Sequence, residues 1–246
     1  MRVLDLFSGI GGFSLGLERA GMRTVAFCEI EPFCRAVLRK HWPNVPCYDD
    51  VRTLTAERLE ADGISVDAIC GGFPCQDISV GGRKVGIEGE RSGLWREYCR
   101  LIRDLRPKFA LMENVGALAF RGLERVLADL AEIGFDAEWQ TVSASAIGAP
   151  HARDRVWIIA YPQRQGLSGL EPIWKGVCRQ PRETPTQFGD EVIRCGSEWP
   201  MLGEYLRMGD GLPRPVDEVK SLGNAVVPQI PQIIGEAIMF YEQQSH

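Results

Sequence analysis

The chain opens with MRVLDLFSGIGGFSLGLERAG, residues Met1–Gly21, a stretch whose hydrophobic pattern changes twice. Met1–Phe7 predicts a short apolar strand, and Ser8–Gly12 predicts a tight glycine turn. The spacing of apolar residues in Phe13–Ala20 then predicts a helix that ends at Gly21. This order is typical of a unit that holds a nucleotide-like ligand, because the turn lets the backbone approach and the helix N-terminus offers N–H groups.

An acidic residue follows the next predicted strand. Thr24–Cys28 is apolar and ends at Glu29, which is placed to accept hydrogen bonds from ribose hydroxyls. The dinucleotide fingerprint is incomplete, because Ser14 stands where its third glycine would be. A nicotinamide cofactor is therefore disfavoured, and a Rossmann-type oxidoreductase is only a distant alternative.

Strand and helix patterns alternate from Arg2 to Tyr161, which predicts a doubly wound, mostly parallel α/β sheet. The predicted strands lie near Arg2–Leu6, Thr24–Glu29, Val66–Gly71, Phe109–Met112, Ala137–Ser143 and Val156–Tyr161, and the helices near Gly12–Ala20, Pro32–His41, Thr55–Asp62, Leu94–Leu105 and Arg121–Ile133. We expect a core over 1–161, a small irregular lobe over 162–214 where the periodicity lapses, and a C-terminal segment over 215–246 that resumes a helical pattern.

A cysteine follows the third predicted strand. Val66–Cys70 and two glycines lead into Phe73-Pro74-Cys75-Gln76-Asp77, so that Cys75 would stand at the mouth of the sheet beside a rigid proline. N–H groups at a strand-to-helix junction favour a thiolate. A buried structural cysteine is the alternative for any such residue taken alone.

Composition narrows the class of protein. The chain has 246 residues, 45% of them hydrophobic, and no apolar run approaches the length of a membrane span. Eight cysteines without a CxxC pair indicate free thiols in a reducing compartment, and three scattered histidines argue against a metal site. The net charge of −5 argues against a protein that coats nucleic acid indiscriminately but allows a local basic cleft.

Five segments, in this order, give the chain a resemblance to the cytosine-C5 DNA methyltransferases. Asp5–Gly12 resembles the S-adenosylmethionine motif, and Gly72–Gln76 the motif of the catalytic cysteine. Glu113–Val115 resembles the motif of the catalytic acid, Arg153–Arg155 the paired arginines, and Gly223–Pro228 the C-terminal cofactor motif. His151 departs from the usual glutamine before the arginine pair. The expected signature between that pair and the last motif is hard to find, and the segment there resembles that of compact phage and bacterial members with a reduced target-recognition region.

The resemblance implies a DNA (cytosine-5-)-methyltransferase that uses S-adenosylmethionine and needs no metal. Its target cytosine would be flipped out of double-stranded DNA and bonded at C6 by Cys75. The implied catalytic residues are Cys75, Glu113, Arg153 and Arg155. The implied cofactor-binding residues are Asp5, Phe7, Ser8, Gly9, Gly11, Gly12, Glu29, Ile30, Asp50, Val51, Phe73, Pro74, Leu94, Asn224 and Ala225.

A glycine-rich, charged segment after the cysteine, 79–90, is suited to a lid that closes on DNA. The expected DNA-binding residues are Gln76, Ser79, Gly82, Arg83 and Lys84, and target choice is expected to reside in Pro162–Arg214. We expect a cytoplasmic monomer in a bacterial or phage-infected cell, of the kind found in restriction-modification systems. An RNA cytosine-C5 methyltransferase and a catalytically silent DNA-binding homologue are the alternatives.

Overall fold

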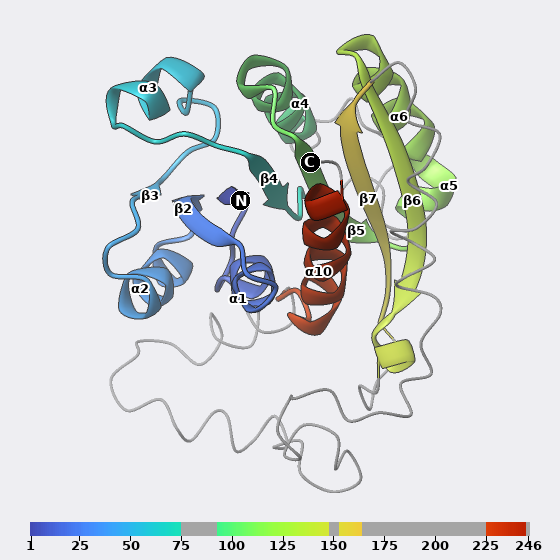
Figure 1. Cartoon of the computed structure of the whole chain (residues 1–246), viewed down its shortest axis with the longest axis horizontal. Helices are drawn as coiled ribbons and strands as arrows, with labels where there is room; N and C mark the ends of the chain where they lie inside the picture. Colours follow the sequence, from blue (N-terminus) through green and yellow to red (C-terminus); the bar gives the residue numbers. More distant parts are fainter. Residues whose placement is uncertain (75–92, 148–152, 164–224, 245–246) are drawn as a thin grey trace, which may run out of the picture.

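The computed structural model describes residues 1–74, 93–147, 153–163 and 225–244, and the structural statements below refer to these residues. They form one seven-stranded sheet with helices on both faces (Figure 1). The strands are β1 (Arg2–Leu6), β2 (Arg23–Cys28), β3 (Cys47–Tyr48), β4 (Ala68–Gly71), β5 (Phe109–Val115), β6 (Phe135–Ser143) and β7 (Asp154–Pro162).

The strand order in the sheet is β3-β2-β1-β4-β5-β7-β6. The first five strands in this order run parallel, whereas β7 is antiparallel to both of its neighbours. The chain moves outward from β1 in one direction to β3 and then returns to add β4 and β5 on the other side. The sheet is therefore doubly wound, as the sequence predicted, with its switch point between β1 and β4.

Alternating side chains of the strands form two hydrophobic layers. Leu4 and Leu6 of β1 belong to one cluster and Val3 to the other, because successive strand residues point to opposite faces. The first cluster is covered by α3 (Ala56–Ala61), α4 (Gly93–Leu105), α5 (Leu118–Arg121) and α6 (Leu123–Glu132), and the second by α1 (Gly12–Arg19) and α10 (Gln229–Gln244). The remaining helix, α2 (Pro32–His41), follows β2.

The C-terminal helix α10 packs beside α1, the helix of the opening unit (Figure 1). Ile230, Ile234 and Ile238 recur at a spacing of one turn and are buried in the same cluster as Leu17. The chain just before α10 also approaches the start of α1 closely. A Cβ added to Gly12 would lie 2.5 Å from the carbonyl oxygen of Val226, so only glycine allows this contact.

The predicted elements differ from the observed ones in three places. β5 continues to Val115, because its last three residues pair with the start of β7, so Glu113 lies inside the strand and not just after it. The helix expected near Arg121–Ile133 is α6, but a short helix that was not expected, α5, precedes it and is separated from it by Gly122. The short β3 and the 3-10 turn η1 (Ala144–Ile147) are too brief to give a periodic signal and were not predicted.

The described residues also bear on membrane spans and metal sites. None of their helices is both long and apolar enough to cross a membrane. Within the same residues, no three His, Cys, Asp or Glu side chains are grouped in a way that could hold a metal ion.

Candidate active site

The motif segments meet at one edge of the sheet. Parallel strands β1, β2, β4 and β5 all end at this edge, and β7 begins there because it runs in the opposite direction. Open α/β sheets bind ligands in the crevice outside these carboxyl ends, next to the switch point. The topology therefore brings residues from distant parts of the sequence to a common site.

The turn after β1 is held by backbone geometry. Phe7 has a φ of 52°, a left-handed conformation that non-glycine residues seldom adopt and that clusters at functional sites. The hydroxyl of Ser8 donates to the carbonyl oxygen of Asp5 at 2.6 Å, and the Gly11 N–H donates to the carbonyl oxygen of Ser8 at 2.9 Å. Gly9 and Gly11 have φ values of 55° and 90°. Helix α1 follows this turn directly. It begins at Gly12, and no side chain caps its N-terminus.

Asp5 lies behind this turn. Its side chain is fully buried and accepts a hydrogen bond of 2.6 Å from the hydroxyl of Ser14 in α1. Burial raises the pKa of Asp5 to about 7, and the Ser14 hydrogen bond opposes that rise. Ser14 stands where the dinucleotide fingerprint has its third glycine, and its hydroxyl connects α1 to β1. The contact of Asp5 with the cofactor, which the resemblance implied, remains a prediction.

Glu29 connects the end of β2 to the glycine turn. Its Oε2 accepts from the Gly9 N–H at 2.7 Å and its Oε1 from the Glu31 N–H at 2.8 Å. The side chain is only 7% exposed, although it follows a strand end, whereas the neighbouring Ile30 is 58% exposed. The carboxylate predicted to meet a ribose thus also organises the backbone turn.

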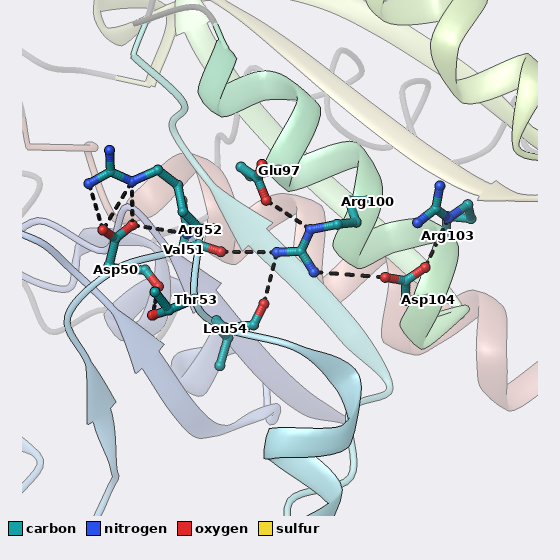
Figure 2. Close-up of polar contacts among 9 residues, drawn as sticks. All are labelled: Asp50, Val51, Arg52, Thr53, Leu54, Glu97, Arg100, Arg103 and Asp104. Atoms are coloured by element: carbon teal, nitrogen blue, oxygen red, sulfur yellow. Dashed lines mark hydrogen bonds and ion pairs between the residues drawn. The ribbon is translucent and has the colours of Figure 1, made fainter. Parts of the chain in front are cut away.

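The loop after β3 carries the other two residues expected near an adenine. Val51 is buried, and the Asp50 carboxylate accepts hydrogen bonds from the backbone N–H and guanidinium of Arg52 (Figure 2). The side-chain hydrogen bond from Arg52 lowers the pKa of Asp50. Asp50 is therefore held as a carboxylate, the form that accepts hydrogen bonds from an amino group.

The segment that leads to Cys75 is attached to β5. The side-chain amide of Asn114 donates to the carbonyl oxygen of Phe73 at 3.0 Å, and its Oδ1 accepts from the Val115 N–H at 2.8 Å. Both Asn114 and Phe73 are buried. Pro74 follows and is half-buried. The amide thus fixes the backbone two residues before the cysteine.

Glu113 forms an ion pair with the arginine motif. Its Oε1 accepts from Nε of Arg155 at 2.9 Å, and the glutamate is only 9% exposed. Burial raises the pKa of Glu113, while the positive charges of Arg155 and Arg153 oppose the rise. Burial and the charge of Arg155 also lower the pKa of Arg153. A carboxyl group with a raised pKa beside two guanidinium groups is suited to donating a proton to a ring nitrogen.

Gly72 brings the cysteine segment close to this acid. A Cβ on Gly72 would lie 3.0 Å from Oε2 of Glu113, so a larger residue would press on the carboxylate. Because β4 and β5 pair in parallel with Gly71 beside Met112, Gly72 follows the end of β4 next to the position of Glu113 in β5.

Helix α4 lies beneath both the glycine turn and the cysteine segment. Tyr98 stacks on Phe7 with ring centroids 6.3 Å apart, and Trp95 packs on Phe73 at 5.0 Å. The Tyr98 hydroxyl donates to the carbonyl oxygen of Leu111 at 2.9 Å, which anchors the helix to β5. Leu94, an expected cofactor residue, is half-buried in the first turn of α4.

The predicted site residues thus fall into two groups. The residues that the structure describes lie at or behind the carboxyl edge of the sheet. They stand at the strand ends, in the loops that follow the strands, or in the first turns of α1 and α4. Ala225 lies next to Val226, which contacts the start of α1. The residues outside the described ranges are Cys75, Gln76, Ser79, Gly82, Arg83, Lys84 and Asn224, and so are His151 and nearly all of 162–214. The roles expected of these residues remain predictions.

Sequence reasoning gave no individual part to three residues of this edge. Asn114 and Gly72 lie in the motifs of Glu113 and Cys75, and the motifs implied no contact for either residue. An amide directly after an expected catalytic acid was the one sign in the sequence that could have pointed to Asn114. Arg100 of α4 contacts the loop that carries Asp50 and Val51. No motif pointed to it, because its partners in the loop are backbone carbonyls.

Comparison with known proteins agrees with the geometry. Residues 1–191 match the family model described as C-5 cytosine-specific DNA methylase. The type II methyltransferase M2.BsuMI of Bacillus subtilis (strain 168) is 38% identical over 168 residues, spanning 65% of this chain and 42% of the relative. M.CviJI of Paramecium bursaria Chlorella virus IL3A is 35% identical over 161 residues, with the same two shares. The chain thus spans less than half the length of these curated relatives.

A solved structure extends the comparison of the fold. The Entamoeba histolytica methyltransferase EhMeth aligns with a TM-score of 0.69 at 14% identity and covers 98% of both chains. That likeness concerns the fold alone, whereas the family match covers most of the sequence. The sheet, its carboxyl edge and the sequence match agree, and this chain belongs to the C-5 cytosine-specific DNA methylase family.

Proposed function

We propose that this protein transfers a methyl group from S-adenosylmethionine to C5 of cytosine in DNA. The observation that carries the proposal is the buried ion pair between Glu113 and Arg155, which lies against Gly72 at the start of the cysteine segment. An acid and a cation beside the segment that leads to Cys75 support the proposal that the target pyrimidine binds there. The family match supports the same chemistry.

The residues at the end of β1 and β2 fit such a cofactor. The glycine turn leaves the start of α1 without a side-chain cap, and the Glu29 carboxylate lies beside it as an acceptor for ribose hydroxyls. Asp50 offers an acceptor to an adenine ring, and Val51, which is largely buried in the core, is proposed to touch the ring with the small part of its side chain that stays exposed. Bound S-adenosylmethionine would supply an electrophilic methyl group.

The protein groups would act on the cytosine ring. The Cys75 thiolate bonds to C6, which moves an electron pair through the ring toward N3 and makes C5 nucleophilic. Glu113 donates a proton at N3, and Arg155 holds Glu113 and the base in place. After C5 has taken the methyl group, loss of the C5 proton allows the thiolate to leave C6. Arg153 supplies a second positive charge close to the acid.

The substrate is proposed to be double-stranded DNA, from which the target base must be flipped, since a stacked base does not expose its ring to such a site. Gln76, Ser79, Gly82, Arg83 and Lys84 are proposed to contact this DNA, and 162–214 to select the sequence. The monomer and its place in the cytoplasm of a bacterial or phage-infected cell are part of the same proposal.

Bisulfite sequencing tests this function directly. DNA from cells that express the protein should show protected cytosines within one short sequence, and DNA from cells that express Cys75→Ala should show none. Purified protein with tritiated S-adenosylmethionine should label a DNA duplex that contains this site and leave the matched RNA duplex unlabelled. Labelling of the RNA alone would replace the DNA proposal, and labelling of neither would favour a silent DNA-binding homologue.

A substitution at Glu29 tests the cofactor site. Glu29→Ala is expected to weaken S-adenosylmethionine binding by about 1.5–3 kcal/mol, the value of a charge-assisted hydrogen bond. It should also lower the melting temperature, because the N–H groups of Gly9 and Glu31 lose their acceptor. Calorimetric titration and thermal unfolding measure the two effects. Glu31→Ala, which keeps both N–H donors and the Glu29 carboxylate, is the control, and equal cofactor affinity in all three proteins would exclude Glu29 from the site.

A further inference from the structure

Arg100 of α4 makes contacts that the reaction scheme does not use. Its Nη2 donates to the carbonyl oxygen of Val51 at 3.1 Å and to that of Leu54 at 2.8 Å (Figure 2). Its Nε donates to Glu97 at 2.8 Å, and Nη1 lies 3.8 Å from Asp104. Two carboxylates of the same helix therefore orient the guanidinium, and its Nη2 contacts the loop that carries Val51 and Leu54.

The loop over residues 50–54 receives little support from the sheet. The strand before it, β3, has two residues and pairs only at the edge of the sheet with β2. Internal hydrogen bonds to the carbonyl oxygen of Asp50 shape the turn, and the buried side chains of Val51 and Leu54 face the core. Arg100, whose side chain is 24% exposed, makes a direct polar link from the central helix α4 to this loop.

The same helix also supports the other two segments of the site. Tyr98 lies under Phe7 of the glycine turn and Trp95 under Phe73 before the cysteine. Since α4 holds all three segments, the spacing between the loop and the glycine turn depends on a helix that contacts both. A bond from Arg100 to the carbonyl of Val51 fixes the residue that is expected to touch the adenine.

We propose that Arg100 is a positioning residue of the cofactor pocket, which holds the loop over residues 50–54 in the conformation that receives the adenine. This inference rests on the proposed binding of S-adenosylmethionine at Asp50 and Val51. Without the guanidinium, the competent loop conformation is populated only in part, and the apparent dissociation constant rises by the reciprocal of that fraction. Saturating cofactor then restores the competent state, so the rate of methyl transfer is preserved.

The test compares variants of one helix by calorimetric titration with S-adenosylmethionine and by steady-state kinetics. Arg100→Ala is expected to raise the Kd and KM for S-adenosylmethionine about tenfold or more, as loss of charge-assisted hydrogen bonds predicts, with kcat within about twofold of wild type. The Kd and KM of Arg100→Lys should lie between those of the wild type and those of Arg100→Ala, because a single ammonium group replaces the planar guanidinium. Arg103→Ala is the matched control, since Arg103 pairs with Asp104 and is 58% exposed.

Glu97→Gln keeps the test decisive if Arg100→Ala does not fold. It removes the charge that orients Nε of Arg100 and should raise the same Kd by a smaller factor. The inference for Arg100 would be overturned if Arg100→Ala and Glu97→Gln bound S-adenosylmethionine with the wild-type Kd, or if kcat at saturating cofactor fell with Kd unchanged. Either outcome would leave the proposed function standing. Failure of the wild-type protein to bind S-adenosylmethionine would instead overturn the proposed function and this inference with it.

Discussion

Cys75→Ser is expected to lower the rate of cytosine methylation by about 10⁴-fold or more, the scale seen when a catalytic nucleophile is removed. A serine hydroxyl is far less ionised than a thiol near neutral pH and attacks C6 poorly. Binding of the cofactor should persist, because the groups proposed to hold it come from β1, β2 and the loop after β3. The measurement is tritium transfer to DNA under single-turnover conditions.

A mechanism-based probe makes the same prediction sharper. Once C6 is bonded to sulfur and C5 has received the methyl group, the C5 substituent must leave as a proton before the thiolate can depart. Fluorine at C5 does not leave in this way. A duplex with 5-fluorocytosine at the target should therefore retain the wild-type protein through denaturing electrophoresis, only when S-adenosylmethionine is present, and should not retain Cys75→Ser.

Another cysteine of the chain provides the matched control. Cys99 lies on α4, and burial raises the pKa of its thiol to about 11, so it carries little thiolate at neutral pH. Cys99→Ser is expected to form the trapped complex as the wild-type protein does. If Cys75→Ser were trapped too, another residue would be the nucleophile. If the wild-type protein methylated DNA but formed no trapped complex, the covalent route would be wrong.

The parts of the site that were predictable from sequence depend on local patterns. The strand, glycine turn and helix of Met1–Gly21 follow one another in the chain, so hydrophobic spacing and turn residues determine them together. The same is true of Glu29, which follows an apolar run directly. The family motifs then indicated which strand ends belong together, and the sheet order agrees with that indication.

The parts that were not predicted depend on contacts distant in sequence. The apolar run ends at Met112, yet β5 continues through Glu113 because β7 supplies the ladder of hydrogen bonds. The hydrogen bond from the hydroxyl of Ser14 to the buried carboxylate of Asp5 joins α1 to β1, and neither residue shows it in the sequence pattern. Arg100 acts on carbonyl oxygens that every residue possesses. A pattern in one chain carries no sign of these partners until the fold brings them together.

Glu113→Gln is expected to lower kcat by about 10²–10⁴-fold, the usual contribution of a positioned general acid. The amide keeps the shape of the side chain but has no acidic proton for N3. Cofactor affinity should remain at the wild-type value, since Glu113 contacts Arg155 and Gly72 and not the glycine turn. Single-turnover rates and titration with S-adenosylmethionine separate the two quantities.

The same variant should change how stability depends on pH. Burial raises the pKa of Glu113 above its ordinary value, so the folded protein binds this proton more tightly than the unfolded chain does. The resulting stabilisation is complete below the unfolded-state pKa and is lost as the pH rises through the folded-state pKa. Glu113→Gln does not titrate, so its free energy of unfolding should fall less than that of the wild type over this pH range.

Denaturant unfolding at a series of pH values tests this sign. Glu138→Gln makes the same chemical change on β6, where Tyr161 donates to the carboxylate at 3.2 Å, and serves as the control that should keep wild-type activity. A steeper loss of stability with pH in Glu113→Gln than in the wild type would mean that the arginines outweigh burial. Glu113 would then be a fixed carboxylate unable to supply a proton. The dependence of stability on pH thus decides between two roles for Glu113, an acid that donates a proton to N3 and a carboxylate that only holds Arg155. The first role requires a raised pKa of Glu113 and the second a lowered one.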